Sequence, residues 1–341
     1  MVVLAWWSTC FLLDLLMQSG LRGKRIIILG AVIGMLACVS TAYALFFQPA
    51  GGGKTFSVKA GENLAELSVR LEQEGIVKSG LVLRTLAKLE HLDATVKSGN
   101  YRLNSDVSPR ELLFILQDGP PRVEVLIPEG ASVRDIDDIL AGKGLISPGE
   151  FVQQVKTMSS LVEGYLFPDT YHFTVGMTSA EMIKIMRDNF ARKAAPELPQ
   201  DPRELQKTII LASILEKEVQ TPQDQRIVAG IIEKRLQQGM RLQVDASLCY
   251  AKRERMAQAG QRWQGCYPLT DLDKADTSPY NTYLFEGLPP GPLGNPGLSA
   301  ITAALHPASS DYLFYLSAAS GETIFARNFE EHKRNIAKYL R

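Results

Sequence analysis

The stretch Leu211–Gln220, LASILEKEVQ, places two carboxylates at the end of an apolar run. The spacing of its apolar residues predicts a helix, on which Glu218 falls between Ile214 and Leu215 on the most apolar face. Glu216 falls on the other side, among smaller residues. Because apolar surroundings disfavour the charged form of a carboxyl, we expect Glu218 to have a raised pKa and to act as a general acid.

A purely structural reading of Glu218 is also open. In that reading the side chain ends the helix and pairs with Arg226 or Arg241. Most acids at helix ends have such a role, so the acid alone does not define a site.

Groups suited to holding a sugar follow this helix in Arg241–Asp245 (RLQVD) and in the Pro- and Gly-rich loop Thr277–Gly297. Irregular loops of this length are usually functional. Rings can stack on sugars and amides can bind hydroxyls, so we expect a cleft wall, although each residue taken singly could be a turn or core residue. The candidate contacts are Glu216, Gln243, Asp245, Tyr280, Asn281, Tyr283, Phe285 and Asn295.

The segment Ile26–Phe47 is apolar, uncharged and long enough to cross a bilayer as a helix. Arg22, Lys24 and Arg25 precede it, so the positive-inside rule places the tail 1–25 in the cytoplasm and the chain after Gln48 outside. A cleaved signal peptide is the alternative, but the apolar run is longer than those segments usually are. We therefore predict a single-pass protein of the cytoplasmic (inner) membrane with its functional part in the periplasm or outside.

The first 20 residues are apolar too, but Asp14 interrupts them and the run is short for a membrane span. One hypothesis is that translation begins at Met17, which leaves a short basic tail before the predicted span. An intact mass that includes Met1 would exclude it.

The 341 residues carry 37 basic and 37 acidic side chains, a balance that gives no electrostatic signature of nucleic-acid binding. The four cysteines and four histidines show no spacing typical of zinc ligands. We predict neither a metal nor a cofactor.

Two segments, Lys59–Ser79 and Pro128–Pro148, align without gaps, with Gly61 matching Gly130 and Gly75 matching Gly144. Each copy predicts a strand, a turn at a glycine, a helix and a stop at a second glycine. The units resemble LysM modules, which bind peptidoglycan glycan, but a packing motif used twice explains the matching positions equally well.

Five motifs give the chain a resemblance to the endolytic murein transglycosylases of the YceG-like family, from about residue 54 to the C-terminus. They are EGYLFPDTY (163–171), ASILEKE (212–218), RLQVD (241–245), SPYNTY with GLPPGPLGNPG (278–297) and ALHPA (304–308). The family's catalytic acid maps onto Glu218. Val244 departs from the small hydroxyl residue that is usual in the family, which leaves the roles of its neighbours less defined.

The resemblance implies an α+β fold: an N-terminal transmembrane helix (26–47), a linker (48–56), a small LysM-like strand–helix region (57–155) and a larger mixed α/β catalytic domain (156–341). It also implies cleavage of the β-1,4 bond between N-acetylmuramic acid and N-acetylglucosamine by attack of the muramic acid's own C6 hydroxyl, which leaves 1,6-anhydro ends. The implied partners are peptidoglycan glycan strands and a peptidoglycan synthase beside which nascent strands would be terminated.

Two other functions are also compatible with the sequence. A hydrolytic muramidase would cut the same bond with Glu216 or Asp245 as its second carboxylate, although Glu216 faces away from Glu218 on the helix. A non-catalytic adaptor would only hold peptidoglycan through the repeats.

Cys249 and Cys266 lie on the oxidising side of the membrane in the predicted topology. Free thiols there would be liable to oxidation, so we expect a disulfide, with two small buried thiols as the alternative.

Overall fold

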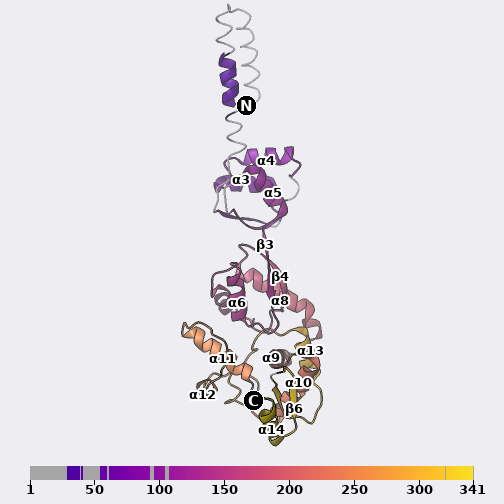
Figure 1. Cartoon of the computed structure of the whole chain (residues 1–341). Coiled ribbons are helices and arrows are strands. Elements are labelled where there is room, and N and C mark those ends of the chain that lie inside the picture. Colours follow the sequence, from indigo (N-terminus) through magenta and orange to yellow (C-terminus); the bar gives the residue numbers. More distant parts are fainter. Residues whose placement is uncertain are drawn as a thin grey trace, which may run out of the picture. The chain divides into compact units, whose positions relative to one another are not determined.

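The computed structural model describes residues 29–38, 40, 54–59, 61–92, 96–103, 107–318 and 320–340. Its contacts divide the chain into two compact units, Met1–Pro121 with Thr174–Gly176 and Arg122–Phe173 with Met177–Arg341 (Figure 1). Residues 29–38 are helical and exposed. Half of the predicted membrane helix, all of the first 20 residues and most of the linker lie outside the described residues. No helix within the described ranges is both long and apolar enough to cross a membrane.

The first unit contains a short antiparallel pair, β1 (Thr55–Val58) with β2 (Gly99–Arg102). In this pair Phe56 lies opposite Tyr101, and their rings stack at 5.2 Å. The helices are α3 (Leu64–Gln73), α4 (Gly80–Leu89) and α5 (Pro109–Asp118). Side chains at their N-caps accept backbone N–H bonds, and their apolar faces enclose one core built on Leu67, Leu71, Leu83 and Leu112.

The second unit begins with the same order of elements. Its strands β3 (Arg122–Ile127) and β4 (Asp169–Thr174) pair with each other, and α6 (Val133–Gly142) and α7 (Glu150–Thr157) lie between them in sequence. Helix α8 (Ser179–Lys193) follows. A core around Phe151, Phe173 and Met182 holds these elements together.

The strand–turn–helix prediction is confirmed for both copies of the repeat. The aligned Gly61 and Gly130 both adopt left-handed φ, +80° and +74°, and Gly75 and Gly144 do so at +68° and +70°. The copies nevertheless belong to different units, because the structure divides the chain after Pro121, whereas the sequence suggested a boundary near residue 155.

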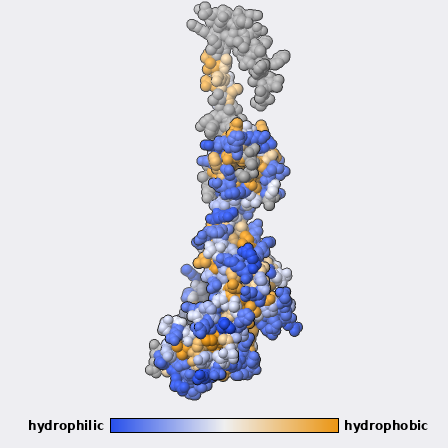
Figure 2. All heavy atoms as spheres, turned by 90° about the vertical axis from the view of Figure 1, so that its right-hand side faces the viewer, coloured by the Kyte–Doolittle hydropathy of each residue, from blue (hydrophilic) through white to orange (hydrophobic). Residues whose placement is uncertain are grey.

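The remainder of the second unit is mostly helical and packs around α9 (Pro202–Glu218). Every residue of α9 from Ile209 to Leu215 is buried, as the sequence predicts. The other elements are a 3₁₀ turn (Ala195–Glu197), α10 (Pro222–Gln237), α11 (Asp245–Gln258), α12 (Asp271–Lys274), α13 (Leu298–Leu305), β5 (Phe314–Ser317), β6 (Thr323–Ala326) and α14 (Phe329–Tyr339). The expected mixed α/β character is therefore confirmed. On the face shown in Figure 2, hydrophilic residues predominate on this unit and apolar residues are scattered among them.

Main-chain contacts join the second repeat copy to the Pro- and Gly-rich loop. The N–H of Gly130 donates to the carbonyl of Asn295 at 2.8 Å, and the N–H of Asn295 donates to the carbonyl of Ala131 at 3.0 Å. A Cβ at Gly294 would lie 2.3 Å from the carbonyl oxygen of Gly130, so only glycine allows this approach. The second copy is thus built into the body that contains α9.

Candidate active site

Glu218 is the last residue of α9, and the chain leaves the helix at Val219 with extended backbone angles. The buried run before it fixes the helix end, so the carboxylate projects from a rigid element. Its side chain lines two cavities, one of about 300 Å³ and one of about 600 Å³. Glu218 therefore stands where the two cavities meet.

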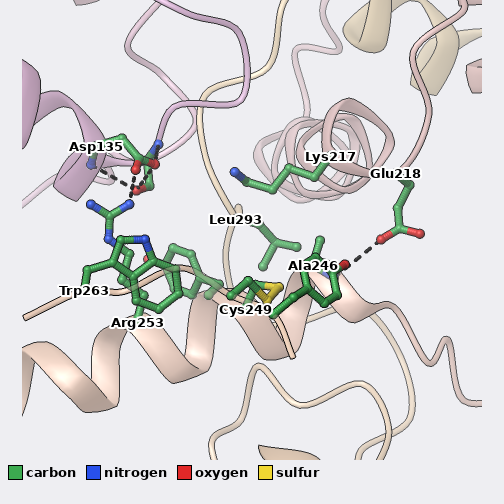
Figure 3. Close-up of a pocket in the computed structure, with 12 residues that line it drawn as sticks. Asp135, Lys217, Glu218, Ala246, Cys249, Arg253, Trp263 and Leu293 are labelled. Atoms are coloured by element: carbon green, nitrogen blue, oxygen red, sulfur yellow. Dashed lines mark hydrogen bonds and ion pairs between the residues drawn. A yellow bond between two sulfur atoms is a disulfide. The ribbon is translucent and has the colours of Figure 1, made fainter. Parts of the chain in front are cut away.

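Two donors hold the Glu218 carboxylate. The backbone N–H of Ala246, in the first turn of α11, lies 3.4 Å from Oε1, and the hydroxyl of Tyr315 on β5 donates to Oε2 at 3.1 Å (the Ala246 contact is drawn in Figure 3). Burial raises the pKa of Glu218 to about 7, the two hydrogen bonds act in the opposite direction, and the charge of Asp245 adds to the rise. The raised pKa agrees with the expectation from sequence.

Glu218 does not pair with Arg226 or Arg241, as the alternative reading of the sequence proposed. Arg226 donates to the carbonyl of His306, and Arg241 donates to the carbonyl of Tyr283. Within the described part of the chain, neither guanidinium forms an ion pair with Glu218.

Three predicted contacts meet Glu218 in the larger cavity: Gln243, Asp245 and Tyr283. The Tyr283 hydroxyl donates to Oδ1 of Asp245 at 2.5 Å, which fixes both side chains. Gln243 has a left-handed φ of 53°, held by a 3.1 Å bond from its N–H to the carbonyl of Thr282. The buried N–H of Val244 donates to the Thr282 hydroxyl, so the chain turns sharply into α11.

Aromatic and cationic side chains line the smaller cavity. Lys217, Arg253, Trp263 and Tyr267 contribute to it, together with the disulfide between Cys249 and Cys266 (Figure 3). The Arg253 guanidinium lies 5.5 Å from the centre of the Trp263 ring. The predicted disulfide is confirmed, with Cα atoms 5.1 Å apart, and it closes the loop that carries Trp263.

Glu216 faces away from these cavities, as its position on the helix predicts. Its Oε2 accepts the N–H of Gly297 at 2.8 Å, at the N-terminus of α13. Burial raises its pKa, and the Gly297 bond opposes that rise. In this position Glu216 stabilises the start of α13 and lines neither cavity, contrary to its inclusion among the contacts.

Four other predicted contacts, Tyr280, Asn281, Phe285 and Asn295, are also not among the residues that line these cavities. Asn281 is fully buried: its Nδ2 donates to the carbonyls of Lys274 and Asp276, and its Oδ1 accepts the N–H of Tyr283. Tyr280 packs its ring on Tyr250, with ring centres 4.6 Å apart. These two residues shape the loop from within. Phe285 is exposed and lines neither cavity.

Asn295 is fully buried as well, and its amide is fully used inside the protein. Oδ1 accepts the N–H groups of Gly164 and Leu166 at 2.9 and 2.8 Å, and Nδ2 donates to the carbonyl of Ala131 at 2.8 Å. The residue thus ties the second repeat copy to the EGYLFPDTY segment. Its amide character is needed for this junction and not for a ligand.

Sequence reasoning missed Tyr315 and Glu163. Tyr315 lies in an ordinary strand pattern, 97 residues after Glu218, so nothing local marks it. Glu163 belongs to the EGYLFPDTY motif, and its carboxyl accepts the N–H of Val133 at 3.0 and 3.1 Å and faces Tyr250. Burial raises the pKa of Glu163 to about 8. In the described ranges, His, Cys, Asp and Glu side chains form no group of three that could hold a metal ion.

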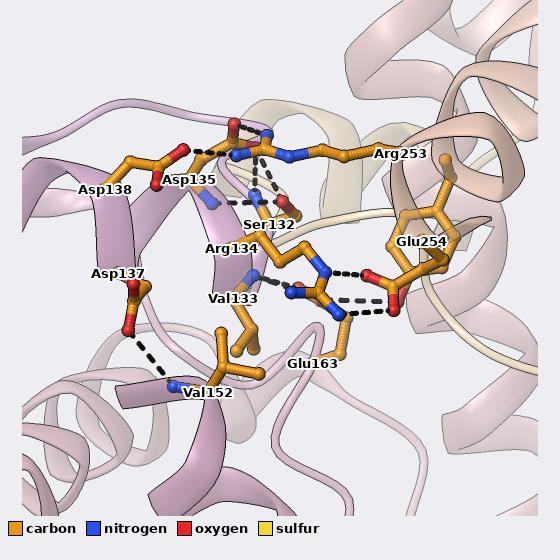
Figure 4. A network of polar contacts seen from close by, with 11 residues as sticks. Ser132, Val133, Arg134, Asp135, Asp137, Asp138, Val152, Glu163, Arg253 and Glu254 are labelled. Atoms are coloured by element: carbon orange, nitrogen blue, oxygen red, sulfur yellow. Dashed lines mark hydrogen bonds and ion pairs between the residues drawn. The ribbon is translucent and has the colours of Figure 1, made fainter. Parts of the chain in front are cut away.

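Ion pairs connect helices α6 and α11 beside the smaller cavity (Figure 4). Arg134 forms a two-pronged pair with Glu254, and Arg253 contacts Asp135 and Asp138. These contacts hold the second repeat copy against the helix that supplies Ala246 and Cys249.

The fold and the site define an α+β protein with one enclosed carboxyl at the junction of two cavities. The chain belongs to the YceG-like family, which matches residues 56–338.

Similar proteins cover most of the chain. A Bacillus subtilis protein named endolytic murein transglycosylase is 27% identical over 314 residues, which are 83% of this chain and 84% of that protein. A Streptococcus pneumoniae protein of the same name is 27% identical over 328 residues, 84% of this chain but 58% of that longer protein. The crystal structure of a yceG-like protein from Listeria monocytogenes, also 27% identical, matches with a TM-score of 0.50 and covers 83% of this chain and 99% of that one.

Proposed function

We propose that the protein is a lytic transglycosylase that cleaves the glycan strands of peptidoglycan, with Glu218 as its general acid. One observation carries the proposal: a carboxyl with a pKa raised to about 7 stands where two cavities meet. Membership of the YceG-like family and the names of the similar proteins support it.

The bond to be cut is the β-1,4 bond between N-acetylmuramic acid and N-acetylglucosamine. Glu218 gives its proton to the leaving oxygen as the bond to C1 breaks. The C6 hydroxyl of the muramic acid then attacks C1, and the Glu218 carboxylate takes the proton of that hydroxyl. No water is consumed, and the acid returns to its starting form.

One carboxyl is sufficient for this reaction because the nucleophile belongs to the substrate. Glycosidases that use water or form a covalent intermediate need a second carboxylate. A hydroxyl held beside C1 already has a high effective concentration. Asp245, fixed by Tyr283 in the same cavity, presents a negative charge that can stabilise the positive charge developing on the sugar ring.

The two cavities suit a cut within a strand. Sugars on either side of the scissile bond can be held in different cavities, because Glu218 lines both. An enzyme that only removed terminal sugars would instead need a site that is closed just beyond the terminal unit.

We further propose that residues 26–47 anchor the protein in the cytoplasmic membrane, with the site outside. The apolar sequence and the basic residues before it support this topology, as does the Cys249–Cys266 disulfide, which suits an oxidising compartment. An enzyme anchored there beside a peptidoglycan synthase would terminate nascent strands. The LysM-like repeats would bind the glycan.

The test is digestion of purified peptidoglycan by the full-length protein, wild type against Glu218→Gln, with mass analysis of the products. Glu218→Gln keeps the shape of the side chain and removes the transferable proton, so cleavage should fall by roughly 10²–10⁴-fold. Glu216→Gln is the matched control on the same turn and should keep most of the activity. Products that are one water heavier would identify a hydrolase, and more than about a tenth of the wild-type rate in Glu218→Gln would exclude this residue as the acid.

A further inference from the structure

Lys217 precedes Glu218 and extends into the smaller cavity. Figure 3 shows its ammonium group pointing away from the Glu218 carboxylate, toward the side of the cavity where Asp135 and Arg253 lie. The residue is exposed, yet its surroundings lower its pKa through partial burial of the charge. Its cation therefore stands in a partly enclosed space next to the proposed acid.

No carboxylate of the described residues pairs with Lys217. The charged groups that share the smaller cavity are otherwise occupied: Arg253 and Asp135 pair with each other, and Glu218 is held by Tyr315 and Ala246. Lys217 alone among the charged side chains lining this cavity has neither a hydrogen bond nor an ion pair to the described part of the chain.

Two carboxyls act electrostatically on Lys217 when they are ionised, but neither forms an ion pair with it. They are Glu163 and Glu216, and each accepts a backbone N–H instead, from Val133 and from Gly297. With a pKa raised to about 8, Glu163 is mostly uncharged at neutral pH. The positive charge of Lys217 is left for a ligand.

The Lys217 side chain lies against two glycines. A Cβ at Gly294 would lie 3.3 Å from its Cε, and a Cβ at Gly130 would lie 3.8 Å from its Cγ. The aliphatic part of the Lys217 side chain thus packs on main chain where the second repeat copy meets the Pro- and Gly-rich loop. A long side chain held in this way loses less entropy when it binds an anion.

We propose that Lys217 binds a carboxylate of the peptide stem carried by the glycan strand and so makes the enzyme selective for stem-bearing peptidoglycan. The inference rests on the proposed function. The stems attached to muramic acid carry free carboxylates, and the unpaired cation lies one residue from the acid that acts on that sugar. Aromatic Trp263 and Tyr267 in the same cavity offer surfaces for the sugar rings.

The experiment compares two forms of peptidoglycan whose amines have been acetylated: one with free stem carboxylates and one with those carboxylates capped as methylamides. The quantity measured is the ratio of kcat/KM on the free form to kcat/KM on the capped form, for the full-length protein. A charge-assisted hydrogen bond predicts a ratio of roughly ten for the wild type. Lys217→Met keeps the aliphatic part of the side chain and should reduce the ratio to about one. Lys217→Arg keeps the charge and should preserve most of the ratio.

A third substrate separates the stem from the lactyl group of muramic acid, which gains a free carboxylate when an amidase removes the stem. Dependence on Lys217 that appears only with the stripped strands would overturn the assignment to the stem. An unchanged ratio in Lys217→Met would overturn the inference, as would equal losses on all substrates. Absence of anhydro products from the wild type on every substrate would instead refute the proposed function.

Discussion

The hydroxyl of Tyr315 donates a 3.1 Å hydrogen bond to Oε2 of Glu218, from a strand 97 residues later in the chain. This bond favours the carboxylate and so lowers the Glu218 pKa against the effect of burial. A general acid must be protonated to act, so kcat/KM should fall as pH rises above about 7.

In Tyr315→Phe the bond is lost and the Glu218 pKa rises. The fall of kcat/KM on the alkaline side of the pH profile (its alkaline limb) should therefore move to higher pH. Tyr312→Phe is the control, since the Tyr312 ring stacks on Phe325 and its hydroxyl has no bond to Glu218. The measurement is the pH profile of kcat/KM on purified peptidoglycan. A limb at the same pH in Tyr315→Phe would show that the bond does not tune the acid.

Tyr283 and Asn281 are separated by one residue but should behave differently. Tyr283→Phe removes the donor to Asp245 in the larger cavity, so kcat/KM should fall roughly tenfold with little change in Tm. Asn281→Ala breaks three buried hydrogen bonds within the loop and should lower the free energy of unfolding by roughly 1–3 kcal/mol. Activity and thermal unfolding measured on both variants test the distinction, and equal loss of stability in the two would contradict it.

Glu163 should make the protein less stable as pH rises. Its folded-state pKa of about 8 lies above the usual value of a glutamate, so the folded state retains a proton that the unfolded state has released. The stabilising contribution is complete below the unfolded pKa and is lost as pH rises through about 8. The slope is about 1.4 kcal/mol per pH unit for one proton.

In Glu163→Gln the amide oxygen can still accept the N–H of Val133, but no proton is exchanged. Urea unfolding at about pH 5 and about pH 8.5 should therefore show a smaller decrease in stability for the variant than for the wild type. An identical decrease would mean that other groups cause the pH dependence.

The pair of Arg134 and Glu254 should couple measurably. Both side chains are partly buried, with exposed fractions of 21% and 33%, and the contact is two-pronged. A double-mutant cycle with alanine should give a coupling free energy of roughly 0.5–2 kcal/mol. The exposed pair Lys184–Asp188, with fractions of 76% and 62%, serves as the reference and should give less than about 0.5 kcal/mol.

Loss of the disulfide should destabilise the wall of the smaller cavity. Cys249→Ser with Cys266→Ser opens a loop of 17 positions, worth roughly 3 kcal/mol in the loop-entropy description. Thermal unfolding of the variant and of the reduced wild type should agree. Thiol labelling of the denatured, unreduced wild type should find neither of these cysteines reactive, and labelling of both would refute the bridge.

Local sequence patterns were sufficient to predict α9, its buried run and the enclosed position of the Glu218 carboxyl. Apolar periodicity identified α9 and the face of Glu218, and the repeated glycines marked turns that require positive φ in both copies. The same patterns explain why Glu216 faces the other way.

Patterns along the chain could not show which amides are consumed inside the protein. Asn281 and Asn295 have the chemistry of sugar contacts, but their partners come from Lys274, Asp276, Ala131 and the Gly164 region, and only the folded chain brings these together. Tyr315 was missed for the same reason. The unit boundary differs because the second repeat copy makes its contacts, including the main-chain bonds of Gly130 and Ala131 to Asn295, with the rest of the second unit.

The contact of Gly130 with Gly294 and Asn295 also limits how the protein can be re-engineered. Main chain packs directly on main chain in this contact, so no side-chain substitution can compensate for a change in it. The second repeat copy is therefore not an independent unit that could be deleted or transferred to another protein. A deletion within residues 122–157 would remove the main chain on which Lys217 packs. It would also expose the surface of the second unit that this segment covers.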